Sequence, residues 1–278
     1  RSEQMMTRQF EGVNVVITGA TGVIGSTFVK GLVEKGANVG ILGRSEDKIV
    51  ELQDEIDKER QQTVALVANV LDKDALTQAK LKYNDTFGAV TILINGAGGN
   101  NPNATTNDEM YDEQGDKTFF DLTEDGIDKV FKLNYTGTFL PSQVFGKDVV
   151  SSEAGTIINI SSMNAFTPLT KIPAYSGAKA SVSNFTQWLS TYFAGHMRVN
   201  AIAPGFFETA QNKALLRNED GSYSERASKI LSQTPMNRFG VPEDILGTLY
   251  WLMDKELSGF VTGIVVPVDG GFSSYSGV

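Results

Sequence analysis

A glycine-rich turn near the N-terminus constrains the fold of this chain more than any other feature. Residues 13–18 are mostly apolar and β-branched, which is typical of a buried strand, and residues 26–35 predict a helix. Gly19, Gly22 and Gly25 lie between these two segments. Glycine permits a positive φ, lets a ligand approach the backbone and lets the helix pack closely on the strand. Because the start of a helix offers free N–H groups to an anion, the turn predicts a site for the pyrophosphate of a dinucleotide.

Strands and helices alternate along the rest of the chain. Short apolar runs predict further strands at 39–42, 64–68, 90–94, 156–160, 199–203 and 261–268. Capped or amphipathic segments predict helices between them, including a long one from Thr123 to about 150 and another from about Tyr175 to 194. No linker or shift in composition divides the chain. The pattern predicts an α/β fold over residues 1–278, a single domain with one doubly wound parallel sheet of about seven strands and helices on both faces.

Composition excludes several classes of function. The net charge of −9 argues against a nucleic-acid or anionic membrane partner, because like charges repel. The chain has no cysteine and one histidine, His196, so we expect no metal site and no thiol chemistry. No apolar run approaches the ~20 residues that cross a bilayer, and the first residues lack the order of a secretory signal. We therefore expect a cytoplasmic protein.

A tyrosine and a lysine four residues apart are the strongest catalytic candidates. Tyr175 and Lys179 open a predicted helix and project from the same face of it. A phenol whose pKa falls toward neutrality can exchange a proton with a carbonyl or an alcohol. Lowering the pKa of a tyrosine from ~10 by about 3 units requires roughly 4 kcal/mol of preferential phenolate stabilisation, which a nearby cation can partly supply. Such pairs also occur by chance on surfaces, but this one follows the fifth strand, at the edge where parallel sheets bind ligands.

Together, these features resemble the short-chain dehydrogenase/reductase family. The resemblance extends over nearly the whole chain and is carried by Thr-Gly-x-x-x-Gly-x-Gly at 18–25, Asn-Gly-Ala-Gly at 95–98, Tyr-x-x-x-Lys at 175–179, Pro-Gly at 204–205 and Val-Asp-Gly-Gly at 268–271. It implies a Rossmann-type fold and an NAD(P)-dependent oxidoreductase. The chain departs from the family at Gly96, where a second asparagine is usual, and at Asn69, where an aspartate is usual.

The resemblance also implies two further catalytic residues. The family's serine follows the fifth strand, and we choose Ser162 over Ser161 because it lies thirteen residues before Tyr175. Asn134, in the long helix, matches the family's asparagine that holds a water linking Lys179 to solvent. The predicted catalytic set is therefore Asn134, Ser162, Tyr175 and Lys179.

The end of the second strand bears on the choice of cofactor. Gly43 stands where an acidic residue commonly selects NAD, and Arg44 follows it. Because a guanidinium can bind a 2′-phosphate, the sequence favours NADP, with NAD as the alternative and a merely solvated or adenine-stacked Arg44 left open. The Asn69 carbonyl can still accept a hydrogen bond from the adenine amino group. The predicted cofactor-binding residues are Gly19, Thr21, Gly22, Val23, Ile24, Gly25, Arg44, Asn69, Val70, Asn95, Gly96, Ala97, Gly98, Tyr175, Lys179, Pro204 and Gly205.

Two polar segments bear on the substrate. Residues 98–122 predict a long surface loop that begins with several asparagines, and residues 204–222 correspond to the family's substrate loop. Amides and lysines around a pocket suit a polyhydroxylated anion, although loops are often polar for no such reason. Both segments resemble family members of the D-mannonate oxidoreductase and gluconate 5-dehydrogenase types, which implies interconversion of a keto-sugar acid and an aldonic acid, such as D-fructuronate and D-mannonate. The predicted substrate-binding residues are Asn100, Ser162 and Lys213, with Lys171 or Arg217 as alternatives for the carboxylate.

Two other functions remain open. The first is a 3-oxoacyl or general carbonyl reductase on the same scaffold. The second is a regulator that senses a dinucleotide without turnover, although a sensor has no need of Ser162, Tyr175 and Lys179. The resemblance further implies a homotetramer with the long helices and the last strand at subunit contacts, and Trp188 and Trp251 are candidates for the core or for those contacts.

Overall fold

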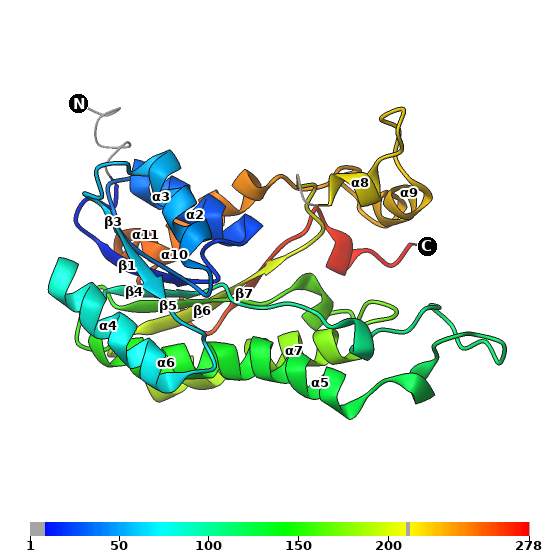
Figure 1. Cartoon of the computed structure of the whole chain (residues 1–278), viewed down its shortest axis with the longest axis horizontal. Helices are drawn as coiled ribbons and strands as arrows, with labels where there is room; N and C mark the ends of the chain where they lie inside the picture. Colours follow the sequence, from blue (N-terminus) through cyan, green and yellow to red (C-terminus); the bar gives the residue numbers. More distant parts are fainter. Residues whose placement is uncertain (1–8, 210–211, 278) are drawn as a thin grey trace.

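A computed structural model describes residues 9–209 and 212–277. Seven parallel strands form one sheet in the order β3-β2-β1-β4-β5-β6-β7 (Figure 1). Their bounds are β1 Asn14–Thr18, β2 Asn38–Gly43, β3 Thr63–Val67, β4 Ile92–Asn95, β5 Thr156–Ile160, β6 Arg198–Pro204 and β7 Val265–Val268. This confirms the predicted sheet. The strand order reverses between β1 and β4, which is where doubly wound sheets open a crevice for ligands.

Helices cover both faces of the sheet (Figure 1). One face carries α2 Val23–Glu34, α3 Glu46–Ile56, α10 Leu246–Met253 and α11 Lys255–Ser258. The other face carries α4 Lys73–Phe87, α5 Glu124–Phe131, α6 Gly137–Val149 and α7 Pro173–Tyr192. No helix within the described ranges has the combination of length and low polarity that a bilayer crossing needs.

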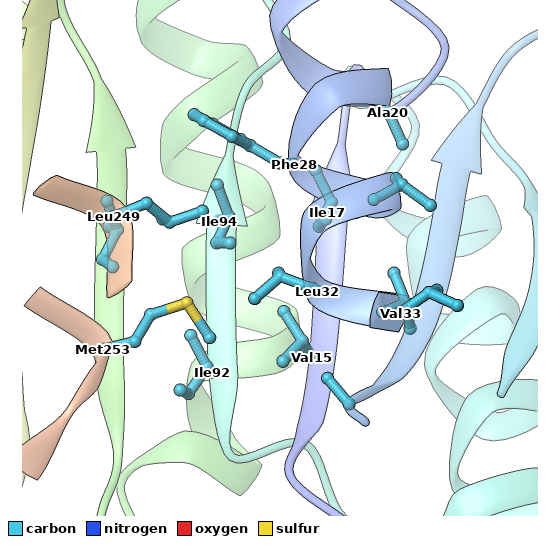
Figure 2. Packing of buried hydrophobic residues seen from close by; sticks show 14 of the residues in the cluster. Val15, Ile17, Ala20, Phe28, Leu32, Val33, Ile92, Ile94, Leu249 and Met253 are labelled. Atoms are coloured by element: carbon cyan, nitrogen blue, oxygen red, sulfur yellow. The ribbon is translucent and has the colours of Figure 1, made fainter. Parts of the chain in front are cut away.

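The alternation of side chains along each strand divides the core into two layers. Val15 and Ile17 pack with Phe28 and Leu249 on the α2 face (Figure 2), whereas Val16 packs with residues of α4, α6 and α7 on the opposite face. Full burial of an aliphatic or phenylalanine side chain contributes roughly 1.5–3 kcal/mol, so both layers hold the strand ends in place. The functional loops are thus built on a rigid frame.

The long helix predicted from Thr123 to about 150 is interrupted. Thr123 caps it as expected, because its side chain accepts from Gly126 N at 3.0 Å, but α5 and α6 are separated by a π turn over Lys132–Thr136. Side chains bond to the backbone on either side of this wider turn: Asn134 Nδ2 donates to Val130 O at 2.8 Å, and Thr138 Oγ1 donates to Asn134 O at 2.8 Å. Both are local bonds to the residue four positions earlier, and helical periodicity does not predict the wider turn that they flank.

Two long connections leave the carboxyl edge of the sheet. The segment after β4 contains short 3₁₀ turns at Pro102–Ala104 and Phe119–Asp121, and we call residues 105–121 the insertion. The connection after β6 forms α8 Lys213–Leu216 and α9 Glu225–Ser232, which we call the lid. Both extend to the same end of the molecule in Figure 1. An ion pair of 2.5 Å between Glu109 and Lys229 joins them.

The last strand lies within its predicted range. Residues 261–268 predict a strand, and Val265–Val268 forms it. Residues ahead of it are held by individual bonds to β6, such as Gly263 N to Val199 O at 2.8 Å. β7 is the edge of the sheet and is only partly buried.

Candidate active site

The glycine-rich turn after β1 has no room for a side chain at Gly19 or at Gly25. Gly19 has a φ of +62°, and a Cβ there would lie 2.7 Å from Ala97 N. A Cβ on Gly25 would lie 2.2 Å from Gly19 O. Gly22 is the N-cap of α2 and provides no side-chain cap for the first N–H groups of that helix. We call residues 19–25 the glycine cradle. This geometry fits the pyrophosphate of a dinucleotide.

The ends of β1 and β4 are joined directly beside this cradle. Thr18 Oγ1 accepts from Gly96 N at 3.1 Å and from Ala97 N at 3.3 Å. A Cβ at Gly96 would lie 2.7 Å from Thr18 O, so a larger residue at this position would force the two strand ends apart. This close approach is a physical reason for the glycine where the family usually has asparagine.

The residues expected around the adenosine lie at the ends of β2 and β3. Arg44 is exposed just after β2, and Gly43 lies beside Thr21, since a Cβ on Gly43 would be 3.5 Å from Thr21 Oγ1. Asn69 Oδ1 accepts from Leu71 N at 3.0 Å and keeps a second lone pair for another donor. The Val70 side chain is buried in the core, so only its backbone could contact a ligand.

Tyr175, Lys179 and Ser162 converge at the carboxyl end of β5. Pro173 begins α7, and one turn places Lys179 Nζ 5.7 Å from the centroid of the Tyr175 ring. Ser162 follows β5, and its hydroxyl faces Tyr175. Lys179 is buried, and its Nζ donates to Ile160 O at 2.8 Å. The three side chains form one cluster, as the sequence predicted, while Ser161 Oγ donates to Lys179 O at 3.1 Å.

The Asn134 side chain completes the cluster from the π turn. Its amide bonds to both backbone groups of Gly99, donating to the carbonyl at 2.7 Å and accepting from the N–H at 3.1 Å. A Cβ on Gly98 would lie 2.7 Å from Asn134 Oδ1 and 3.0 Å from Lys179 Nζ. Asn134 therefore holds the loop after β4 against the lysine. Its role in holding a water stays a prediction.

Burial dominates the electrostatics of the cluster. It raises the pKa of Tyr175 to about 12, and hydrogen bonding with Ser162 lowers that pKa in the opposite direction. Burial also lowers the pKa of Lys179 to about 8. The expected acidification of Tyr175 by Lys179 is therefore outweighed by desolvation in the protein alone. An oxidised nicotinamide, when bound, supplies positive charge that favours the phenolate.

The predicted substrate residues are only partly free. Arg217 makes bonds of 2.8 and 2.9 Å to Glu208, which neutralises it. Lys213 and Lys171 are exposed, whereas Asn100 Nδ2 donates to Thr105 Oγ1 at 2.9 Å. Gly205 follows β6 as expected and donates its N–H to Val268 O at 2.9 Å. Lid positions 210 and 211 lie outside the described residues.

Sequence reasoning did not identify three residues in or near the site, Asn164, Glu109 and Lys229. Asn164 is buried near Ser162 and donates to Ser176 Oγ at 3.2 Å, and Glu109 pairs with Lys229 across 120 residues. The only sequence signal for Asn164 is a polar residue two positions after Ser162. Nothing in the spacing connects Glu109 with Lys229, because their contact depends on the folded loops.

Comparisons with known proteins agree with this geometry. A family model described as short chain dehydrogenase matches residues 13–220. The chain is 52% identical over 269 residues to the uncharacterized oxidoreductase UxuB of Bacillus subtilis (strain 168), covering 96% of this chain and 97% of the relative. It is 31% identical to 5-keto-D-gluconate 5-reductase of Escherichia coli (strain K12), covering 94% and 95% of the two chains. A solved structure from Haemophilus influenzae with bound NAD, provisionally described as a D-mannonate oxidoreductase, has a TM-score of 0.91 at 50% identity and covers 96% of this chain and 97% of its own.

Proposed function

The chain belongs to the short-chain dehydrogenase/reductase family, and from that premise we propose that it interconverts a keto-sugar acid and an aldonic acid, of the D-fructuronate and D-mannonate type, by hydride transfer. The observation that carries the chemistry is the cluster of Ser162, Tyr175 and Lys179 beside the glycine cradle. The substrate class is supported by the sugar-acid names of the E. coli and H. influenzae relatives. Lys171 and Lys213 are exposed, so either could meet a carboxylate.

Each catalytic residue has a distinct task in this proposal. A dinucleotide held by the glycine cradle would supply or accept the hydride. In the reductive direction, Tyr175 would donate its phenolic proton to the substrate carbonyl oxygen. In the oxidative direction, the Tyr175 phenolate takes the hydroxyl proton. Ser162 bonds the same oxygen and orients it. Lys179 stabilises the phenolate through its charge, which is less screened because the side chain is buried.

A substrate panel with one variant tests the function. We expect the parent enzyme to oxidise D-mannonate and reduce D-fructuronate faster than acyl thioesters, followed by nicotinamide absorbance. Tyr175→Phe should lower kcat at least about 100-fold, because the proton is lost, and should weaken dinucleotide binding far less, because Tyr175 is one of many predicted cofactor contacts. Preference for acyl thioesters would support the 3-oxoacyl reductase alternative. Cofactor binding without turnover of any carbonyl would contradict an enzyme.

The cofactor is a nicotinamide dinucleotide, and we propose NADP over NAD because Arg44 stands exposed at the end of β2. NAD in the H. influenzae structure is a reason to test this directly. Arg44→Ala should lower kcat/KM for NADP about 10-fold and change kcat/KM for NAD less than about 2-fold. Lys48→Ala, an exposed cation on the next helix, is the matched control. Equal losses with both cofactors would contradict selection by Arg44.

Lys213 is our candidate for the substrate carboxylate, with Lys171 as the alternative. Arg217 is a weaker candidate because Glu208 already pairs with it. Lys213→Met should raise KM for D-fructuronate about 10-fold with little change in kcat, whereas Lys82→Met, exposed on α4, should change neither. An unchanged KM in Lys213→Met would remove this lysine and direct the same test to Lys171.

A further inference from the structure

We propose that Asn164 is a positioning residue that fixes Ser162 against Tyr175. The inference rests on the proposed oxidoreductase chemistry, but not on the identity of the substrate. Asn164 lies in the 3₁₀ turn Met163–Ala165, immediately after β5, and is 2% exposed.

Asn164 closes a small ring around the two reacting hydroxyls. Its backbone N–H points to Ser162 Oγ at 3.5 Å, and its side-chain Nδ2 donates to Ser176 Oγ at 3.2 Å. Ser176 is the neighbour of Tyr175 in the first turn of α7. The path from Ser162 through Asn164 and Ser176 returns to Tyr175, so the amide connects the turn that carries one hydroxyl to the helix that carries the other.

A second connection supports this reading. Ser161 Oγ donates to Lys179 O at 3.1 Å, one helical turn beyond Ser176. Two short polar connections, from Ser161 to Lys179 and from Asn164 to Ser176, thus join the segment after β5 to α7. Ser161 fixes the lysine end, and Asn164 fixes the tyrosine end.

Asn164 Oδ1 is buried and has no hydrogen-bond partner among the described residues, a state it shares with Asn84 Oδ1 and Asn95 Oδ1. Because two other asparagines share this state, it does not by itself assign a role to Asn164. The bond from Asn164 Nδ2 to Ser176 Oγ carries the proposal, because it joins the turn that holds Ser162 to the helix that holds Tyr175.

The groups around Tyr175 determine how its pKa should respond when Ser162 is displaced. Lys179 is the charged group beside Tyr175 on α7, Ser162 is the hydrogen-bonding group from the turn after β5, and Tyr175 packs on an apolar cluster that includes Ala104 and Val130 from neighbouring elements. Because Ser162 lowers the pKa of Tyr175, displacement of Ser162 should raise that pKa. The kinetic pKa for alcohol oxidation should then move to higher pH.

The test compares Asn164→Leu with Asn84→Leu in the full-length enzyme, on whichever carbonyl or alcohol the parent turns over best. Both variants remove an amide with one unpaired oxygen, but Asn84 lies on α4 and bonds to Asp148, away from the site. We expect Asn164→Leu to lower kcat about 10- to 100-fold with KM for the dinucleotide unchanged, to raise the kinetic pKa, and to shift Tm by less than about 4 °C. Asn84→Leu should leave kcat and the pH profile as in the parent.

Ser176→Ala provides a second, milder variant. It removes the same bond, so its effect on kcat should not add to that of Asn164→Leu in the double variant. Parental kcat and an unshifted pH profile in Asn164→Leu would overturn the proposal, and so would fully additive losses. Failure of the parent on every sugar acid would contradict the proposed substrate alone, because another carbonyl substrate would still report on Asn164.

Discussion

Two buried groups with opposite pKa shifts define the site at the scale of single residues. Burial raises the pKa of Tyr175 and lowers the pKa of Lys179, so desolvation opposes charge on both side chains. The protein alone thus favours a neutral phenol and a weakly basic amine. Cofactor charge is needed to favour the phenolate, which couples proton transfer to dinucleotide binding.

Removing the buried ammonium should therefore stabilise the fold. The pKa of Lys179 is about 8 in the folded chain and 10.5 ordinarily, so the unfolded chain binds more protons between these pH values. The free energy of unfolding should rise with pH across that window, by up to about 3 kcal/mol, and the whole cost is present at pH 7. We expect Lys179→Met to be inactive but more stable at pH 7 by about 1 kcal/mol, since the bond to Ile160 is also lost.

Urea denaturation at pH 7, 9 and 10 without cofactor measures this. The advantage of Lys179→Met should vanish near pH 9 and reverse at pH 10, because the parent gains roughly 2–3 kcal/mol between pH 7 and pH 10, while Lys82→Met, an exposed lysine, should follow the parent at each pH. Tyr175 contributes the opposite trend only above pH 10, because its raised pKa makes stability fall between 10 and about 12. A destabilised Lys179→Met at pH 7 would show that the ammonium is better solvated than its burial indicates.

Residues that share a motif were predictable, and residues that meet only in the folded chain were not. Tyr175 and Lys179 lie one helical turn apart, so spacing alone places them together. Asn164 depends on a bond to another element, and the direction of the Tyr175 pKa depends on burial. Asn134 was located by resemblance, but its amide bonds to Gly99 and Val130 were not foreseeable.

At the scale of elements, two glycine substitutions test whether the lack of space for a Cβ explains the glycines at the start of α2. Gly25→Ala places a Cβ 2.2 Å from Gly19 O, so we expect lower stability by about 1–3 kcal/mol and loss of dinucleotide binding. Gly247→Ala, in α10 with no atom within 4 Å of the added Cβ, should instead stabilise by about 0.5–1 kcal/mol. Thermal unfolding and a fluorescence titration with NADH report both effects, and equal behaviour of the two variants would refute the steric argument.

The Glu109–Lys229 ion pair gives a second prediction for the elements, because it joins the insertion to the lid. Glu109→Gln should loosen the mouth of the site and raise substrate KM about 2- to 5-fold, with kcat and Tm unchanged. The effect should vanish above about 0.5 M salt, where exposed charges are screened. Asp125→Asn, which breaks the equally exposed pair with Lys129 in α5, is the control. A KM shift of the same size in the control would exclude a specific role for the connection.

Helix starts followed the sequence where a side-chain cap sets them. Thr123 caps α5 as predicted, accepting from Gly126 N, and Ser45 caps α3 by accepting from Lys48 N. The first helix, predicted from residue 26, begins at Val23, and a π turn interrupts the long helix where Asn134 bonds to Gly99 in the loop after β4. Periodicity reports which face is apolar, and it does not report such bonds.

At the scale of the whole molecule, exposed apolar groups mark the surfaces where we expect subunit contacts. Trp188 stacks on Tyr192 with ring centroids 4.9 Å apart, yet Trp188 is 55% exposed on α7. Trp251 is half-buried against the core on the other face. β7 leaves a partly exposed sheet edge. These features support the predicted homotetramer, which stays a prediction together with the single-domain organisation and the cytoplasmic location.

Light scattering after size exclusion tests the assembly. We expect a tetramer for the parent, and we expect Trp188→Glu to dissociate it, because a carboxylate would replace the exposed indole at the predicted contact. Leu81→Glu introduces the same charge at a comparably exposed position on α4 and should leave the mass unchanged. A monomeric parent, or an intact tetramer in Trp188→Glu, would show that α7 does not form the contact.

The π turn bears on which neighbours the two halves of residues 124–149 contact. Each residue of an α-helix advances the face by about 100°, so one extra residue at Lys132–Thr136 puts everything after it out of phase with everything before it. As a result, α5 packs on α7 and the Pro102–Ala104 turn, whereas α6 packs on β4, β5 and α4. One continuous segment therefore packs on the helix that carries Tyr175 and Lys179 along its first half, and on the central sheet along its second half.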